Sequence, residues 1–318
     1  MIAVWHIIIF ILSCFLLSWS GSLLISSLTK VARFLGWREF VVAFFIMSFA
    51  TSLPNLFVGI TSALYKIPEL SFGDVVGGNV IDLTVVIALA TLVNRGLPAD
   101  SKMVQASSIF TLIIAVAPLL LVADGQISRA DGLLLILMFL LYTCWIFSKQ
   151  ERFTKTYEIA ADKNKRQGSA LKDVSIVIFG IILLLVGAKG VVVSAMYFAS
   201  NFHMSLGLVG ILIVGLGNCL PEMYFTLFAA RMKEPWMVIG NLMGSVIVCA
   251  TLVLGIVALI QPIVIIDFSP YALARIFLVL ATLFFLVFIR TDRQLTKKEA
   301  LFMLLLYIIF LICEILTK

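Results

Sequence analysis

The stretch Thr51–Leu92 reads TSLPNLFVGITSALYKIPELSFGDVVGGNVIDLTVVIALATL, and a second copy of it begins at Asn218. That copy reads NCLPEMYFTLFAARMKEPWMVIGNLMGSVIVCATLVLG. One ungapped offset of 167 residues, the separation of Pro54 from Pro221, also matches a lysine, a second proline and two glycines. Unrelated apolar sequences rarely match all of these residues in one register. We therefore interpret the chain as an internal duplication.

The composition indicates a membrane protein. Of the 318 residues, 62% are hydrophobic and 13% are charged, whereas a soluble domain carries about a quarter charged residues. The net charge of +6 is not interpreted as a nucleic-acid surface, because basic residues of membrane proteins mainly set orientation. The N-terminal segment lacks a basic start and a small-residue cleavage site, so no cleaved signal peptide is expected.

Ten stretches are apolar enough, at about 20 residues each, to cross a bilayer as helices. They are residues 3–28, 40–65, 69–93, 103–123, 130–148, 172–198, 206–230, 236–262, 268–290 and 299–316. Five stretches precede a central polar loop and five follow it. Because each half has an odd number of spans, the second half has the opposite orientation in the membrane to the first. This inverted arrangement is typical of secondary transporters.

The predicted fold class is therefore an all-α polytopic membrane protein with ten transmembrane helices in two inverted five-helix repeats. The predicted domains are a first repeat over 1–148, a cytoplasmic linker over 149–171 and a second repeat over 172–318. Eighteen basic residues fall in one set of connections and three on the opposite side. By the positive-inside rule, this bias predicts a multi-pass protein of the plasma (inner) membrane with both termini outside.

Polar side chains inside these spans concentrate in the two copies, and polar groups in hydrocarbon are usually functional or paired. Asp74, Gly78 and Asp82 recur every four residues and so share one helix face. Pro54 and Pro221 each remove a helical hydrogen bond and free a carbonyl oxygen. Carbonyl oxygens beside carboxylates suit hard cations, so we expect the polar faces of both copies to converge on one cation site.

At these residues the chain resembles the cation/calcium exchanger superfamily, and its prokaryotic sodium/calcium exchangers in particular. Members carry T-S-L-P-E followed about twenty residues later by G-N-x-x-G-S-N-x-x-D/N, once in each half of a ten-span chain. The resemblance implies that the serine and the acid of each motif bind the transported ions. The positions that it implies as cation ligands, together with their polar neighbours, are Thr51, Ser52, Asn55, Asp74, Asp82, Asn218, Cys219, Glu222, Ser245 and Cys249.

This chain departs from the family pattern at several of those positions. Asn55 and Cys249 stand where the family has acidic or amide ligands, Gly78 and Cys219 stand where it has serine, and only Asp82 and Glu222 remain carboxylates at the four central positions. Two carboxylates balance one Ca²⁺ or two monovalent cations. We therefore expect a secondary active antiporter that exchanges Ca²⁺ for Na⁺ by alternating access, with fewer counter-ions than usual and with no cofactor.

Several alternatives remain at this point. Ca²⁺ or another divalent cation can instead exchange for H⁺ at the buried carboxylates, and the lost ligands also fit a non-transporting cation-binding homologue. An intramembrane aspartyl protease is disfavoured because Asp74 and Asp82 lie about 12 Å apart on one helix, so we expect no enzyme. A passive channel would not need inverted repeats. Lys189 either reaches the outer interface or neutralises a site carboxylate, and the oligomeric state stays open, with a monomer allowed.

Overall fold

The structure is a computed structural model that describes residues 2–34, 47–149, 170–265 and 267–316, almost all of them helical. Within these ranges, nine helices are long and apolar enough to cross a membrane, and they coincide with nine of the ten predicted spans. The remaining predicted span, 40–65, is described from residue 47 onward. Its first part and nearly all of the predicted linker 149–171 lie outside the described residues.

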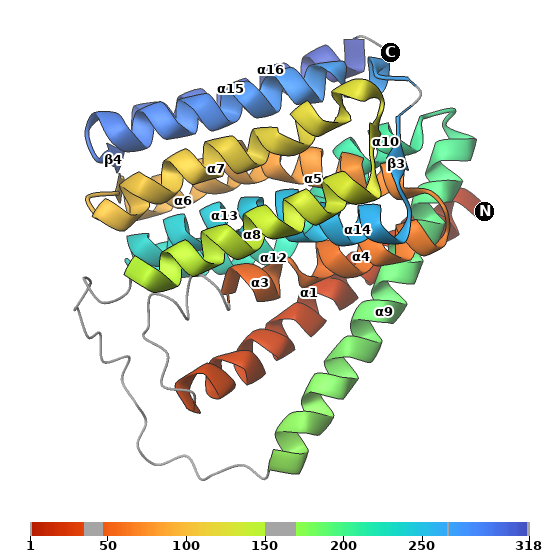
Figure 1. The fold of residues 1–318 in the computed structure, drawn as a ribbon, viewed down its shortest axis with the longest axis horizontal. Coiled ribbons are helices and arrows are strands. Elements are labelled where there is room, and N and C mark those ends of the chain that lie inside the picture. Colours follow the sequence, from red (N-terminus) through yellow and green to blue (C-terminus); the bar gives the residue numbers. More distant parts are fainter. Residues whose placement is uncertain (1, 35–46, 150–169, 266, 317–318) are drawn as a thin grey trace.

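The two halves have the same order of elements (Figure 1). The first half contains α1 (Ile2–Phe34), α3 (Ser48–Thr51), α4 (Leu53–Leu64), α5 (Pro68–Ile81), the π-helical η2 (Asp82–Val86), α6 (Ile87–Asn94), β1 (Leu97–Pro98), α7 (Lys102–Leu121), the 3₁₀ turn η3 (Val122–Asp124), β2 (Gln126–Ile127) and α8 (Arg129–Lys149). The second half contains α9 (Ala170–Asn201), α10 (Leu206–Val209), the π-helical η5 (Gly210–Val214), α11 (Gly215–Asn218), α12 (Leu220–Arg231), α13 (Pro235–Val248), the π-helical η6 (Cys249–Val253), α14 (Leu254–Ile260), β3 (Ile263–Val264), α15 (Ser269–Thr291), β4 (Gln294–Leu295) and α16 (Lys297–Leu316).

The 167-residue offset found in the sequence also relates the helix boundaries. It carries α4 onto α12, α5 onto α13 and η2 onto η6, with both ends of each element matching. Lys66 and Lys233, which the offset also aligns, both adopt left-handed backbone, with φ of 61° and 59°. Each lysine therefore ends a helix, and the proline two residues later begins the next one with its φ already suited to a helix.

Two short strand pairs show how the repeats face each other. β1 of the first half pairs with β4 of the second, and β2 of the first pairs with β3 of the second, both antiparallel. The offset carries β1 onto β3 and β2 onto β4 to within a residue, so the two pairs are equivalent contacts. They lie at opposite ends of the molecule (Figure 1), as a two-fold axis across the helices requires. The strand pairs thus agree with the predicted inversion.

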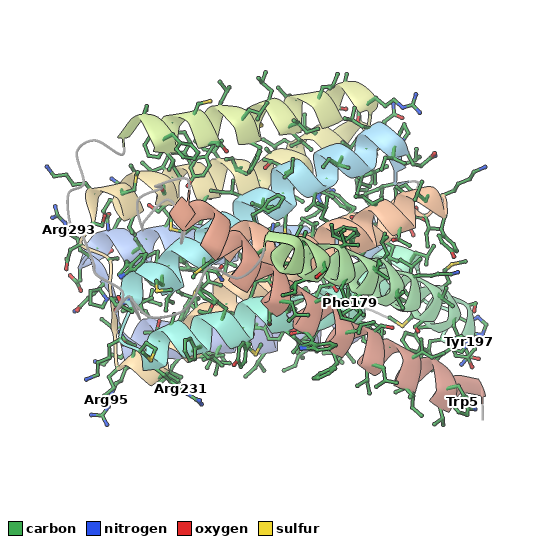
Figure 2. The ribbon with its side chains drawn as sticks, turned by 90° about the horizontal axis from the view of Figure 1, so that it is seen from below. Trp5, Arg95, Phe179, Tyr197, Arg231 and Arg293 are labelled. Atoms are coloured by element: carbon green, nitrogen blue, oxygen red, sulfur yellow. The ribbon has the colours of Figure 1, made fainter. Side chains whose placement is uncertain are left out.

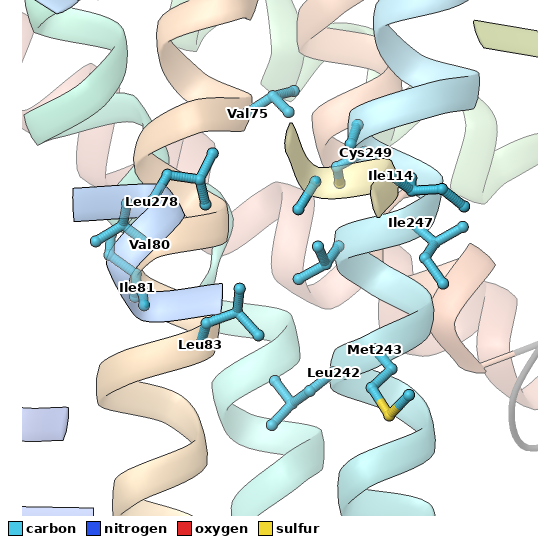
Figure 3. Packing of buried hydrophobic residues seen from close by; sticks show 14 of the residues in the cluster. Val75, Val80, Ile81, Leu83, Ile114, Leu242, Met243, Ile247, Cys249 and Leu278 are labelled. Atoms are coloured by element: carbon cyan, nitrogen blue, oxygen red, sulfur yellow. The ribbon is translucent and has the colours of Figure 1, made fainter. Parts of the chain in front are cut away.

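The centre of the bundle is formed by the duplicated stretches. The span that contains α5 has 83% of its most apolar window buried and the span that contains α13 has 78%, against 22% for α8 and 28% for α16. Figure 3 shows buried side chains from α5 and α13, such as Val80 and Ile247, in one apolar cluster. The outer helices α8 and α16 expose large apolar side chains instead, which suits contact with lipid.

The ends of the molecule differ in chemistry. Arg95, Arg231 and Arg293 lie at one end of the bundle, whereas Trp5 and Tyr197 lie at the other (Figure 2). Both the start of α1 and the end of α16 lie at the end opposite the three arginines (Figure 1). The predicted basic and non-basic connections are therefore separated in space as well as in sequence, for those connections that the structure describes.

Helices α1 and α9 pack closely against each other and run obliquely beside the other helices (Figure 1). Small residues permit this close packing. A Cβ on Gly190 would lie 2.0 Å from the Ser13 hydroxyl oxygen, and a Cβ on Gly187 would lie 2.9 Å from the Leu17 side chain. The two helices also contact α4, α10, α11 and α12, so they border the central bundle on one side.

Candidate functional site

Each repeat has one residue that interrupts a helix at the motif proline. Ser52 separates α3 from α4, and Cys219 separates α11 from α12, with nearly the same backbone angles (φ −83° and ψ −4°, φ −76° and ψ −4°). Pro54 and Pro221 are the second residues of α4 and α12, where a missing N–H is tolerated. The interruptions place Ser52 and Cys219 at equivalent points on the two sides of the repeat interface.

Two other interruptions lie opposite these. Asp82 begins the π-helical η2 and Cys249 begins η6, so both candidate ligands occupy the first position of a π segment. Such segments are rare and are frequent at functional sites. The sequence analysis did not predict them. Within them, Thr84 and Thr251 are aligned by the 167-residue offset, and each donates its hydroxyl to the carbonyl oxygen four residues earlier. Neither threonine side chain therefore joins the candidate site.

The candidate residues meet across the repeats as three pairs, each with an equivalent related by the 167-residue offset. In the first pair, the Asn218 side-chain amide donates to Asp74 Oδ2 at 2.9 Å. Its equivalent joins the Thr51 hydroxyl to Asn241 Oδ1 at 3.4 Å. Asn241 also donates to the Thr226 hydroxyl at 3.3 Å, which brings in a residue that the sequence analysis missed.

The second pair lies at the helix interruptions. Ser52 and Ser245 are joined by a hydrogen bond between their hydroxyls at 3.3 Å. In the equivalent position, the Cys219 thiol donates to the carbonyl oxygen of Gly78 at 3.5 Å. Because Gly78 has no side chain, the hydroxyl pair of Ser52 and Ser245 is present on one side of the two-fold axis only. On the other side, the contact between the Cys219 thiol and the Gly78 carbonyl takes its place.

The third pair is neutral on one side of the two-fold axis and consists of two carboxyl groups on the other. The Asn55 amide donates to Cys249 Sγ at 3.1 Å, and both groups are neutral in this contact. The equivalent pair is Asp82 and Glu222, two carboxyl groups that interact electrostatically. The hydroxyl of Ser245 lies 3.2 Å from Glu222 Oε1 and also interacts with Asp82. Both central carboxylates thus lie on one side of the two-fold axis, although they come from different repeats.

The cluster is buried, and several of its oxygens lack a partner. Asp82, Asp74 and Asn218 are 2%, 1% and 1% exposed, Glu222 is fully buried and Asn55 is 5% exposed. Among the described residues, the side-chain oxygens without a hydrogen-bond partner include one from each of these five: Asn55 Oδ1, Asp74 Oδ1, Asp82 Oδ1, Asn218 Oδ1 and Glu222 Oε2. Buried polar atoms are normally paired, so five such oxygens in one cluster indicate a place for a ligand.

The cluster is rich in side-chain oxygens. It offers carboxylate, amide and hydroxyl oxygens, which hard cations prefer. Within the described ranges, no three or more His, Cys, Asp or Glu side chains are grouped as in a resident metal centre. All ten residues that the sequence pointed to lie in this cluster or in its hydrogen-bonded pairs.

Fold and cluster together define a class of protein: a polytopic membrane protein of two inverted repeats, with a buried polar site at their interface, as in secondary transporters. The family model described as sodium/calcium exchanger protein matches residues 5–148 and 172–316. The chain therefore belongs to the sodium/calcium exchanger family, a family of transporters, and the resemblance seen in the sequence motifs is confirmed.

Individual relatives agree with this assignment. The inner membrane protein YrbG of Escherichia coli (strain K12) is 27% identical over 79% of each chain. The sodium/calcium exchanger MaX1 of Methanosarcina acetivorans is 22% identical over 91% of this chain and 92% of its own. A solved structure of the sodium-calcium exchanger NCX_Mj, soaked with Na⁺ and Sr²⁺, covers 96% of this chain and 97% of its own with a TM-score of 0.67 at 23% identity. That likeness shows the fold.

Proposed function

We propose that this protein is a secondary active antiporter that exchanges Ca²⁺ for Na⁺ by alternating access at the cluster between the repeats. The observation that carries the proposal is the meeting of Asp82 and Glu222, one from each repeat, inside a buried cluster of oxygens without partners. A buried pair of carboxylates is costly unless cations or protons neutralise it. Because each repeat supplies one carboxylate of the pair, a cation bound there would lie at the interface between the repeats.

The charge of the cluster bears on the number of ions exchanged. Asp82 and Glu222 together supply −2 when both are ionised, which one Ca²⁺ or two Na⁺ neutralise. Asp74, whose Oδ2 accepts a hydrogen bond from the Asn218 amide, adds a third charge if it is ionised as well. The equivalent pair, Asn55 and Cys249, adds no charge in its hydrogen-bonded form. We infer that only one side of the two-fold axis holds cations tightly. The exchange would then be electroneutral, with about two Na⁺ per Ca²⁺ by charge balance.

The halves 1–148 and 172–318 would act as the two inverted repeats of this mechanism. Helices α1 and α9 pack against each other and border the central bundle, so we propose that they slide or tilt against it to open the cluster to either side. The end with Arg95, Arg231 and Arg293 would face the cytoplasm, with both termini outside the plasma (inner) membrane.

Ion flux in proteoliposomes tests the function and the stoichiometry together. An imposed Na⁺ gradient is expected to drive Ca²⁺ uptake, whereas an equal K⁺ gradient is not. A potential-sensitive dye should report no sustained membrane potential during uptake, because the charges moved in each direction balance. A strongly electrogenic cycle would contradict the two-for-one exchange. Ca²⁺ binding without any flux would identify a non-transporting homologue instead.

Exchange of Ca²⁺ for H⁺ is the alternative that a specific contact favours. Asp82 and Glu222 are close enough to interact, and two adjacent carboxyl groups readily share one proton when no cation lies between them. In the same liposomes, a pH gradient without Na⁺ would then drive Ca²⁺ uptake. Uptake that needs Na⁺ and ignores the pH gradient would exclude this alternative.

Lys189→Met is expected to leave Ca²⁺ flux within about twofold of wild type. The Lys189 side chain is exposed on α9, so the structure favours the interpretation in which it reaches the interface. Substitutions at exposed positions usually change the free energy of unfolding by less than about 0.5 kcal/mol, which is roughly a twofold change in the folding equilibrium constant. Uptake measured at several Ca²⁺ concentrations checks this, and a loss of tenfold or more would revive the interpretation in which Lys189 neutralises a carboxylate.

A further inference from the structure

Asp74 and Asn218 form a pair whose equivalent in the other half is differently satisfied. Asp74 Oδ2 accepts a hydrogen bond from the Asn218 amide at 2.9 Å, and the Oδ1 atoms of both residues lack a partner among the described residues. In the equivalent pair, the Thr51 hydroxyl donates to Asn241 Oδ1, and the Asn241 amide donates to the Thr226 hydroxyl. Within the described ranges, no buried oxygen of Thr51 or Asn241 is left without a partner. Unpartnered oxygens are therefore confined to one of these two equivalent pairs.

The pair of Asp74 and Asn218 is also separate from the central carboxyl groups. Asp74 precedes Asp82 by eight residues of continuous helix, which is about 12 Å at the usual rise per residue. Asp74 and Asn218 are each 1% exposed, and the amide that donates to Asp74 is neutral and cannot balance its charge. A buried carboxylate is stable in the ionised form only beside a cation. One carboxylate and one amide oxygen suit a single monovalent cation.

Helix α5 is held against the segment that ends at Asn218 by direct contact between backbones. A Cβ on Gly210 of η5 would lie 2.8 Å from the Asp74 backbone nitrogen, and a Cβ on Gly215 of α11 would lie 3.3 Å from the Asp74 carbonyl oxygen. Glycine permits this approach because it has no side chain. Asn218 is the last residue of α11. Asp74 and Asn218 are therefore fixed relative to each other by elements other than α1 and α9.

We propose that Asp74 and Asn218 hold one monovalent cation that stays bound while the central cluster exchanges its ions. The inference rests on the proposed function, in which Asp82 and Glu222 bind the exchanged ions, and it adds an ion that is not exchanged. In the proposed cycle, α1 and α9 move against the bundle, whereas both ligands of the resident cation belong to the bundle. The movement therefore does not separate the ligands. The resident cation balances the charge of Asp74, which then does not enter the exchange stoichiometry.

Equilibrium binding of radiolabelled Na⁺ to the purified full-length protein in detergent tests the inference. In wild type, saturating Ca²⁺ is expected to displace Na⁺ from the central cluster and to leave about one Na⁺ per protein, because one carboxylate carries one charge. Asp74→Asn is expected to lose this retained Na⁺. Asn218→Thr, which removes the amide oxygen, should weaken the affinity for it by at least about 10-fold. Asp292→Asn removes an exposed carboxylate instead and should retain Na⁺ as wild type does.

Thermal unfolding gives a second measurement of the same site. In saturating Ca²⁺, added Na⁺ should raise the Tm of wild type and of Asp292→Asn but not that of Asp74→Asn, because a ligand of the folded state stabilises it. Asp74→Asn should fold, since asparagine stands at the equivalent position, Asn241.

Two results would overturn the inference: a wild-type protein that retains no Na⁺ in saturating Ca²⁺, or an Asp74→Asn variant that retains as much Na⁺ as wild type. Failure of the proposed function looks different. Ca²⁺ would then displace no Na⁺ and would not cross the membrane under a Na⁺ gradient, while Asp74→Asn would still bind one Na⁺ fewer than wild type.

Discussion

Glu222→Gln is expected to reduce Ca²⁺ flux by about 100-fold or more. Glu222 is fully buried, interacts with Asp82 and accepts a hydrogen bond from Ser245. A unit charge at 4 Å contributes about 4 kcal/mol at an effective dielectric of about 20, and a divalent ion doubles that figure. The glutamine retains one oxygen ligand but no charge, so part of this energy is lost. A loss of about 2.7 kcal/mol already corresponds to 100-fold in affinity.

The variant should fold at least as well as wild type, because a buried carboxylate beside another is unfavourable in the absence of a cation. Asp292→Asn is the matched control, since it removes one carboxylate from an exposed position after α15. In Glu222→Gln, both Ca²⁺ uptake into proteoliposomes and Ca²⁺ binding by calorimetry should fall. In the control, both should stay at the wild-type level. Uptake within tenfold of wild type would mean that Glu222 is not a cation ligand.

The periodic features of the fold could be predicted from the sequence. The helices related by the offset between Pro54 and Pro221 have matching ends, because proline and left-handed lysine fix helix boundaries locally. The placement of Asp74, Gly78 and Asp82 on one helix face followed from residue spacing alone. These properties depend on nearest neighbours along the chain, so a single sequence contains them.

The pairing within the site could not be predicted in this way. Spacing places Asp82 on a helix face, but it does not say whether Asp82 meets Asn55 or Glu222 across the interface. The π segments η2 and η6 also change which residues face the interior, and no glycine or proline within them marks their position in the sequence. The separation into a charged pair and a neutral pair therefore emerges only from the packing of the repeats. The exposed direction of Lys189 on α9 was undetermined for the same reason.

Gly77→Ala is expected to prevent stable folding, whereas Gly78→Ala at the next position is expected to be tolerated. A Cβ on Gly77 would lie 2.2 Å from the carbonyl oxygen of Ile211 and 2.6 Å from its Cα, so α5 and η5 would have to separate. Overpacking typically costs about 1–3 kcal/mol, and contact with rigid backbone places this case at or above the upper end. A Cβ on Gly78 meets only the Cys219 sulfur, at an ordinary 3.4 Å.

The two variants make the same chemical change on the same helix, which isolates the effect of the contact with Ile211. Alanine favours a helix over glycine by about 1 kcal/mol, so Gly78→Ala should match or slightly exceed wild-type stability. Thermal unfolding in detergent, followed by size-exclusion chromatography, should show a lower Tm or aggregation for Gly77→Ala alone. Because α5 carries Asp74 and leads directly into Asp82 at the start of η2, the displaced helix should also lose Ca²⁺ binding. Equal Tm values for the two variants would contradict the close approach of α5 and η5 on which the geometry of the site depends.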